Sequence, residues 1–147
     1  MATMNSLDEL LIAELQDLYF VEKHLAKELP KLAKKANDED LKEAFEEHAE
    51  ETNNHISQLE EVFDMLGKKA KSKTCDGIKG ILDEAKEMIG DAGDDVLDAV
   101  LITCAQRAEH YEMAAYGSVR TYAELLGHKD AAKLLQQNLN EEGAADK

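Results

Sequence analysis

One stretch in the second half of the chain limits the possible folds most strongly, because it places two acids in the middle of an apolar stripe. Steps of three and four residues from Ile102 to Leu126 give apolar residues at both ends, with Glu109 and Glu112 at the centre. On an α-helix these positions share one face. Burying an ionised carboxylate costs several kcal/mol unless a cation or a proton neutralises it. Either this face is not buried, or a positive group lies beside the two acids.

The length and composition favour a single helical domain. A chain of 147 residues can hold one hydrophobic core without disulfide or metal staples. Its few glycines and single proline, with abundant Ala, Leu, Glu, Lys and Asp, favour helix over sheet. No segment alternates β-branched and polar residues in the manner of a strand. We therefore expect one all-α domain covering residues 1–147.

The charge excludes several classes of partner. A net charge of −15 argues against binding to nucleic acid and to anionic membrane surfaces, which both require clustered basic residues. The N-terminal sequence lacks the basic-then-apolar layout of a secretory signal, and no apolar run approaches the length of a membrane span. We expect a cytoplasmic protein. Cys75 and Cys104 are far apart in the sequence and are interpreted as reduced thiols rather than zinc ligands.

Hydrophobic periodicity predicts four long helices and a short one. The ranges of the long helices are 6–36, 38–66, 94–126 and 130–147. The short amphipathic helix covers residues 77–89, within a connection that is long for adjacent antiparallel helices. Such a connection suits a crossover along the length of a bundle. The expected fold is a four-helix bundle of two antiparallel hairpins, with a short fifth helix in the crossover.

Counting residues outward from each hairpin turn shows which positions of the two antiparallel helices lie opposite each other. By this count, the polar residues within the apolar stripes of all four helices lie at about the same level along the bundle. Across the first turn, the position opposite Glu22 lies midway between Glu51 and His55. Across the second turn, Glu142 and Asp146 of the last helix lie opposite two positions of the preceding helix. These positions bracket Glu112 and lie close to Glu109. The predicted core cluster consists of Glu22, Glu51, Glu109, Glu112, Glu142 and Asp146, with His48 and His55 nearby.

A dinuclear metal site explains this cluster most economically. Two divalent or trivalent cations cancel most of the negative charge that would otherwise oppose folding. Carboxylate oxygens with one or two imidazoles suit iron or manganese, with zinc as a substitute of similar geometry. We expect His48 to support a ligand rather than to bind metal. Tyr116, on the same stripe as the acids, is the candidate catalytic residue, donating a hydrogen bond or an electron at the centre.

Four segments resemble the YciF/YciE family, a ferritin-like group of bacterial stress-response proteins related to rubrerythrins. They are DLYFVEKHL, HAEETNNHISQLEEVF, AQRAEHYEMAAYGSV and LLQQNLNEEGAAD, and the resemblance covers essentially the whole chain. It implies a ferritin-like bundle, a homodimer and a di-iron or di-manganese centre. The positions where it implies family ligands are Glu22, Glu51, His55, Glu109, Glu142 and Asp146, and Glu112 resembles the second glutamate on the third long helix of rubrerythrins.

The chain departs from the usual bundle pattern at two places. That pattern takes one Glu from each of two helices and Glu-x-x-His from each of the other two. Here Glu51 and His55 are spaced one residue wider, and Asp146 stands where a histidine is expected. The resemblance also implies a further helical stretch after Lys147. We therefore expect weakened metal binding on the side of Asp146 and Glu142.

Three functional hypotheses follow. The first is an oxidoreductase that reduces peroxide or dioxygen at a di-iron or di-manganese centre. The chain contains no C-x-x-C pair for electron entry, which favours a catalase-like cycle over a rubrerythrin-type peroxidase. The second is a metal-binding protein without turnover. The third is a structural helical dimer whose acids form a vestigial, hydrated cluster with raised pKa values and no metal.

Overall fold

Five α-helices account for the regular structure of residues 3–147, the part of the chain described by this computed structural model. They are α1 (Leu7–Lys35), α2 (Glu39–Met65), α3 (Asp76–Asp91), α4 (Asp94–Leu125) and α5 (Lys129–Ala145). No strand occurs among these described residues. The prediction of an all-α fold is confirmed, and every helix end lies within two residues of the expected position. The first two residues of the expected domain lie outside the described part.

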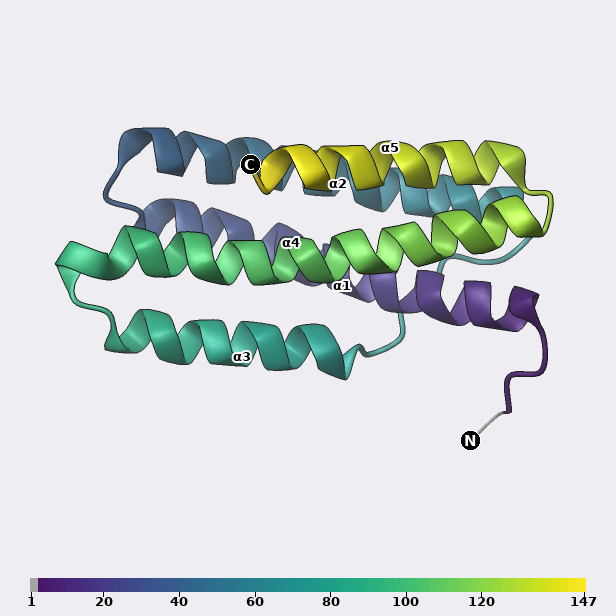
Figure 1. Cartoon of the computed structure of the whole chain (residues 1–147), viewed down its shortest axis with the longest axis horizontal. Helices are drawn as coiled ribbons and strands as arrows, with labels where there is room; N and C mark the ends of the chain where they lie inside the picture. Colours follow the sequence, from purple (N-terminus) through teal and green to yellow (C-terminus); the bar gives the residue numbers. More distant parts are fainter. Residues whose placement is uncertain (1–2) are drawn as a thin grey trace.

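The four long helices pack side by side as a bundle (Figure 1). α1 packs against α2 and α4, and α5 packs against the same two helices, so the contacts close a ring. Short turns join α1 to α2 and α4 to α5, which makes each of these pairs an antiparallel hairpin. The crossover helix α3 packs against α4 on the outside of the ring.

Specific contacts fix the ends of the hairpins. The Asp98 carboxylate on α4 accepts hydrogen bonds from the backbone N–H groups of Asn37 and Asp38, at 2.8 and 2.9 Å. It thereby ties the α1–α2 turn to the second hairpin. Gly67 and Gly127 follow the ends of α2 and α4 with φ angles of 68° and 84°. Glycine adopts this left-handed conformation without the steric cost that a Cβ imposes.

The apolar core is divided into two clusters by a polar layer. One cluster contains Leu15, Leu59 and Leu135, toward the end of the bundle that holds the α4–α5 turn. The other contains Leu29 and Leu101, toward the end that holds the α1–α2 turn. On α1, α2 and α4 the buried polar residues lie where the helix passes from one cluster to the other, and on α5 they follow the residues of the first cluster. The bundle therefore surrounds a polar centre with apolar packing on both sides.

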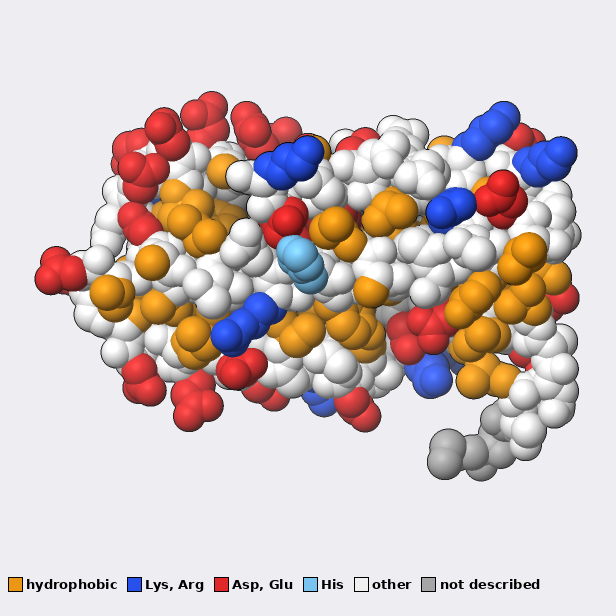
Figure 2. All heavy atoms as spheres, in the orientation of Figure 1, with side chains coloured by type: hydrophobic (Ala, Val, Ile, Leu, Met, Phe, Trp, Pro, Cys, Tyr) orange, Lys and Arg blue, Asp and Glu red, His pale blue; other side chains and the backbone are white. Residues whose placement is uncertain are grey.

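Charge is distributed unevenly over the surface. Figure 2 shows acidic side chains gathered at the end of the molecule where α2 and α4 begin. Each of these helices has two acids in its first turn, Glu39 with Asp40 and Asp94 with Asp95. Acids at a helix N-terminus interact favourably with the helix dipole. Among the described residues, no helix combines the length and apolar character that crossing a membrane requires.

Truncating one of two leucines tests which part of the packing holds the bundle together. Leu59 is fully buried in the first apolar cluster, whereas Leu125 is 71% exposed. Leu59→Ala should lower the free energy of unfolding by about 2–5 kcal/mol, because it removes buried surface and leaves a cavity. Leu125→Ala should change it by less than about 0.5 kcal/mol. Urea denaturation followed by circular dichroism measures both values, and similar values for the two variants would contradict the assigned core.

Candidate metal centre

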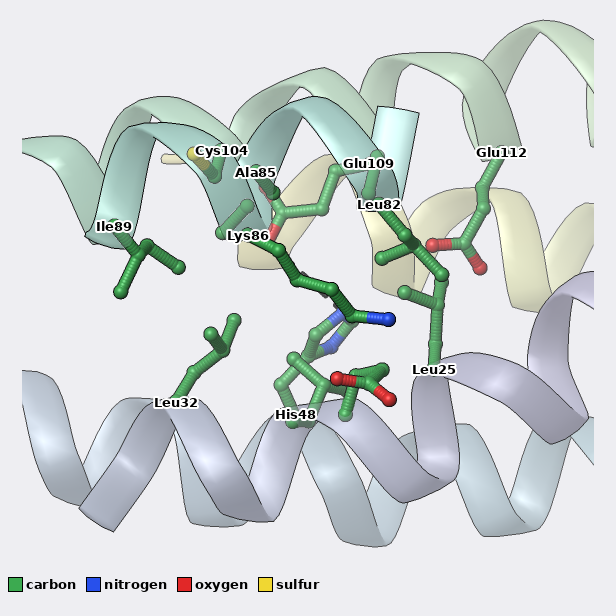
Figure 3. Close-up of a pocket in the computed structure, with 14 residues that line it drawn as sticks. Leu25, Leu32, His48, Leu82, Ala85, Lys86, Ile89, Cys104, Glu109 and Glu112 are labelled. Carbon is green, nitrogen blue, oxygen red and sulfur yellow. Dashed lines mark ion pairs between the residues drawn. The ribbon is translucent and has the colours of Figure 1, made fainter. Parts of the chain in front are cut away.

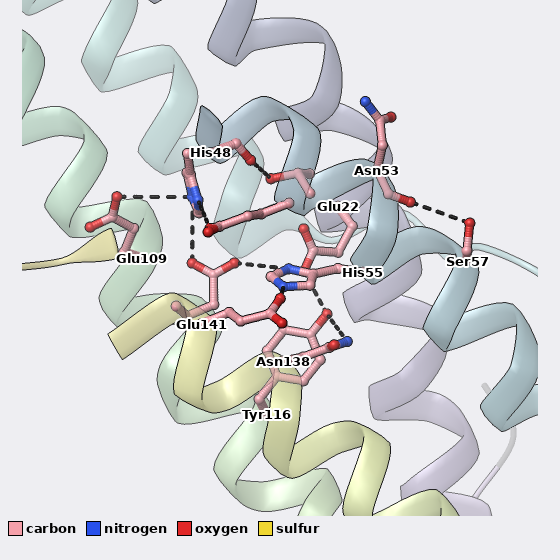
Figure 4. Close-up of polar contacts among 12 residues, drawn as sticks. Glu22, His48, Asn53, His55, Ser57, Glu109, Tyr116, Asn138 and Glu141 are labelled. Carbon is pink, nitrogen blue, oxygen red and sulfur yellow. Dashed lines mark hydrogen bonds and ion pairs between the residues drawn. The ribbon is translucent and has the colours of Figure 1, made fainter. Parts of the chain in front are cut away.

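Eight buried polar side chains occupy the middle of the bundle. Each is at most 6% exposed, and all four long helices contribute (Figure 4). They are Glu22 from α1, His48, Thr52 and His55 from α2, Glu109 and Glu112 from α4, and Asn138 and Glu142 from α5. Such a concentration of buried polar groups requires hydrogen bonding, protonation or a bound cation.

The helical repeat explains why the two imidazoles of α2 lie on the same face of the helix. His48, Thr52 and His55 follow one another at spacings of four and three residues and so share one helix face. The Thr52 hydroxyl donates to the backbone carbonyl of His48 at 2.8 Å, which satisfies that hydroxyl inside the bundle. Glu51 lies on the flank of this face, and its side chain is 42% exposed.

Two groups of three residues bring possible metal ligands together. The first consists of Glu22, His55 and Glu142, and the second of His48, Glu112 and Glu142; within each group the ligand atoms lie within 4.8 Å of one another. His55 Nδ1 is 3.3 Å from Glu22 Oε1 and 3.2 Å from Glu142 Oε1. His48 Nε2 is 3.5 Å from Glu142 Oε2. Glu142 therefore belongs to both groups and turns one oxygen toward each imidazole.

Each imidazole also has a carboxylate on the nitrogen that faces away from Glu142. Glu141 Oε2 lies 2.6 Å from His55 Nε2, and Glu51 Oε2 lies 3.3 Å from His48 Nδ1. Because a carboxylate only accepts, the ring N–H donates in both contacts. Such outer partners hold a metal-binding imidazole in one tautomer and one orientation. They leave His55 Nδ1 and His48 Nε2 as the ligand atoms.

A short chain of hydrogen bonds positions Glu22. The Tyr116 hydroxyl donates to Glu22 Oε1, and the Asn138 side-chain amide donates to the Tyr116 oxygen at 3.3 Å. Tyr116 is fully buried. Burial and the carboxylates of Glu22 and Glu112 raise the pKa of Tyr116 well above its ordinary value. The hydroxyl therefore remains protonated and acts as a donor.

Without a bound metal, the pKa values of several groups in the cluster are raised, so these groups tend to keep their protons. Burial raises the pKa of Glu112 well above its ordinary range, and the Glu22 and Glu142 carboxylates raise it further. Burial also raises the pKa of Glu109 to about 7, against the opposing effect of His48. For His55, burial lowers the pKa, but the contacts with Glu142 and Glu22 outweigh burial and raise it to about 10. Excess negative charge is thus the main electrostatic feature of the centre.

Several ligand atoms have no hydrogen bond from the described residues. Glu22 Oε2, both oxygens of Glu112, both oxygens of Glu142 and His55 Nδ1 are buried and lack an aligned partner. The Glu22 and Glu142 carboxylates also act on Glu112, so three acids crowd together at this point. Two cations would satisfy these atoms at once. The donor set, carboxylates with one imidazole in each group, fits iron or manganese.

The structure brings most of the predicted ligands together. Glu22, His55, Glu112 and Glu142 all belong to the two groups. Glu109 lies outside both groups, with Oε1 at 3.9 Å from His48 Nε2. Glu142 is fully buried within α5, and weaker metal binding on its side of the centre stays a prediction.

Three other predicted positions lie differently from expectation. His48 belongs to the second group and Glu51 stands behind it, the reverse of the expected order, because the inner face of α2 passes through Thr52 rather than Glu51. Asp146 is the C-terminal cap of α5 and lies 2.9 Å from His110 Nε2, outside both groups. Metal binding by each residue stays a prediction.

Sequence reasoning missed two residues of the centre, Glu141 and Asn138. Both are on α5, where Asn138, Glu141 and Glu142 share one side of the helix at spacings of three and four residues. The apolar stripe of α5 does not single out Glu141. The sequence could have indicated it only through a chemical requirement, because an imidazole that binds metal needs an acceptor on its other nitrogen. Its partner, His55, comes from α2, and this contact depends on how the two hairpins pack against each other.

A cleft connects the centre with the surface. It has a volume of about 480 Å³ and lies between α2, α4 and the C-terminal end of α5. Its polar lining includes His48, Glu51, Glu109 and Asp146. We call it the acidic cleft. Carboxylates along this route favour the approach of cations.

The chain is similar to a protein family, to a curated protein and to solved structures. Residues 6–147 match the model of a domain of unknown function, DUF892. The chain is 41% identical to Protein YciF of Escherichia coli K12 over 145 residues, which cover 97% of the chain and 87% of YciF. Two solved structures are similar, each at 41% identity and covering 97% of the chain and 91% of the other chain. They are YcfI of Rhodopseudomonas palustris, provisionally described as a structural protein, at a TM-score of 0.94, and the E. coli stress protein YciF at 0.92.

The pKa shifts predict how the stability of chelator-treated protein depends on pH. Glu109 has a folded pKa of about 7 against an ordinary 4.5, so the folded state keeps a proton that the unfolded state releases in that range. Glu112 shifts in the same direction. His55 contributes stability that is complete below pH 6.5 and lost as the pH rises to about 10. The free energy of unfolding should therefore fall as the pH rises from about 5 to about 9.

A neutral isostere isolates the contribution of one acid. Glu112→Gln should make this decline shallower and stabilise the chelated protein at high pH, because it removes the deprotonation that the folded state resists. Glu61→Gln, on the exposed surface of α2, should leave the profile unchanged. Urea denaturation across the pH range measures both profiles. A wild-type profile that is flat or rises with pH would contradict the assignment of raised pKa values to this cluster.

Proposed function

The chain belongs to the DUF892 family, with YciF among its relatives, and on that basis we propose that it is a ferritin-like stress-response protein with a dinuclear iron or manganese centre. In this proposal Glu22, His55 and Glu142 hold one ion, and His48, Glu112 and Glu142 hold the other. The protein would act on peroxide or dioxygen. A homodimer, as the family resemblance implies, and a location in the cytoplasm complete the proposal.

One observation carries the proposal: a single buried carboxylate is shared by two ligand groups. Glu142 Oε1 faces His55 and Glu142 Oε2 faces His48, and neither oxygen has an aligned hydrogen bond. Glu142 would therefore offer one oxygen to each of two cations, one in each ligand group. Glu112 and Glu22 add further acids beside Glu142, and two cations would balance the negative charge of the whole group.

The outer residues prepare the centre for binding and proton exchange. Two bound ions that change oxidation state would supply the electrons for reduction of peroxide or dioxygen. Glu141 retains the Nε2 proton of His55, so binding would displace only the Nδ1 proton. Glu109, with its pKa near 7, can hold or release a proton beside the acidic cleft at neutral pH. Tyr116 keeps a hydroxyl proton directed at Glu22 Oε1.

A second candidate function is metal binding or a structural role without turnover. It is favoured by the strongly raised pKa values, because protons held by Glu112 and His55 can also neutralise the cluster. The relative YcfI is provisionally described as a structural protein, which agrees with such a role. Metal content and peroxide turnover distinguish these possibilities from the first proposal.

Substitution of the shared carboxylate tests the centre directly. Wild-type protein loaded with iron(II) or manganese(II) should retain two ions per chain, one for each ligand group. Glu142→Gln should lose both, because both groups require that carboxylate, whereas Glu22→Gln should lose one. Glu61→Gln, on the exposed surface of α2, serves as the matched control. Elemental analysis after gel filtration gives the stoichiometry.

The metal stoichiometry also decides between the proposals. Retention of no metal by the wild type, together with a melting temperature that neither metal changes, would favour the structural role. Equal retention by the wild type and Glu142→Gln would place the metal elsewhere. Two ions per chain with no peroxide consumption would favour binding without turnover.

Removing one hydroxyl tests the role of Tyr116 in turnover. Tyr116→Phe should leave the metal content unchanged and lower peroxide consumption by about tenfold or more, because Glu22 Oε1 loses the hydrogen bond from the Tyr116 hydroxyl. Tyr122→Phe, on α4 but only partly buried against the apolar cluster, is the control and should retain full activity. Oxygen-electrode assays at matched metal content measure both rates. Equal rates for the two variants would exclude a role for the Tyr116 hydroxyl.

A further inference from the structure

A second cavity reaches the buried acids from the side covered by α3. It has a volume of about 40 Å³ and lies between α1, α3 and α4 (Figure 3). Leu25 and Leu32 extend into it from α1, and Leu82 and Ile89 extend into it from α3. Most of the remaining wall is also apolar. We call this space the α3 cavity.

The inner end of the α3 cavity is polar and belongs to the candidate metal centre. His48, Glu109 and Glu112 all line it. Glu112 is fully buried, and neither of its oxygens has a hydrogen-bond partner among the described residues. His48 and Glu109 also line the acidic cleft, but Glu112 does not. The α3 cavity is therefore a separate approach to the metal centre. It reaches the second ligand group at Glu112, which the acidic cleft does not contact.

The size and lining of the cavity select a particular kind of occupant. A single water needs about 10–15 Å³ and two to four polar partners. The α3 cavity, at about 40 Å³, is larger than that, and between its inner end and the charged residues Glu28 and Lys86 its walls are apolar. A charged ligand would lose its hydration without compensation along the leucine walls. These properties suit a molecule of a few atoms that is uncharged and apolar.

Two further charged residues of the lining, Lys86 and Glu28, lie away from the metal centre. Lys86 on α3 is exposed, and its side chain extends across the cavity between the two sets of apolar residues (Figure 3). Glu28 on α1 pairs with Lys31 at 2.9 Å. The flexible Lys86 stem can cover apolar surface while its amino group stays in water. This arrangement separates the apolar interior from bulk solvent without sealing it by backbone.

We propose that the α3 cavity binds a small uncharged apolar molecule of the size of dioxygen and holds it beside Glu112. The cavity thereby divides the approach to the centre in two. The acidic cleft suits cations, and the α3 cavity suits an apolar gas. The use of the molecule at the centre rests on the proposed function, whereas its binding in the cavity needs no metal.

Xenon is a probe for this cavity, because small apolar cavities in proteins bind it. In chelator-treated protein under xenon pressure, the methyl resonances of Leu25 and Leu82 should shift and saturate. Ala85→Leu, which fills the cavity from α3 and leaves every acid of the centre in place, should abolish the shifts. Ala99→Leu places the same larger side chain at an exposed position of α4 and should retain them. Ala85→Val is the milder substitution if Ala85→Leu does not fold.

The xenon experiment tests binding in the α3 cavity, and the metal stoichiometry tests the proposed function, so either proposal can fail without the other. Absence of saturable shifts in the wild type, or shifts undiminished by filling the cavity, would overturn the binding proposal. If the protein retains no metal, the proposed function fails while the xenon experiment still decides the site. With iron(II) bound, Ala85→Leu should slow oxidation by dioxygen at unchanged metal content and Ala99→Leu should not. An unchanged rate in Ala85→Leu would overturn delivery through this cavity.

Discussion

The organisation of the bundle depends on the burial of Glu142 between two imidazoles. Its two oxygens face His55 at 3.2 Å and His48 at 3.5 Å, and the residue is fully buried on α5. A carboxylate in this position is stable only if positive charge balances it. That requirement links α2 and α5, which belong to different hairpins, and it brings Glu22 and Glu112 from the other two helices into the same balance.

The polar centre and the apolar packing depend on each other. The two hydrophobic clusters on either side exclude water from the acids, and this exclusion raises the pKa values of Glu109 and Glu112. The acids in turn oppose folding whenever they are left ionised and uncompensated. Protons, imidazolium and metal ions can all provide the compensation. Metal binding, protonation and folding stability are therefore expected to be coupled in this protein.

The two imidazoles have the same pattern of contacts, but their outer carboxylates come from different helices. Each presents one nitrogen to Glu142 and the other to an outer carboxylate, Glu51 for His48 and Glu141 for His55. Glu51 is on the same helix as its imidazole, three residues away, so local geometry alone brings the pair together. Glu141 reaches across from α5 and depends on the packing of the two hairpins. The second contact is the shorter, at 2.6 Å against 3.3 Å.

Sequence by itself determined the helices, the family and the height at which the polar residues meet. Helical periodicity and turn positions are local properties, and they sufficed to bring Glu22 opposite the region of His55 and to give α4 two central acids. Only the tertiary structure decided which side chains share a group. Rotation of α2 placed His48 inside and Glu51 behind it, and packing of α5 against α2 brought in Glu141. Those outcomes depend on angles between helices, which arise from side-chain packing across the whole bundle and not from spacing along one chain.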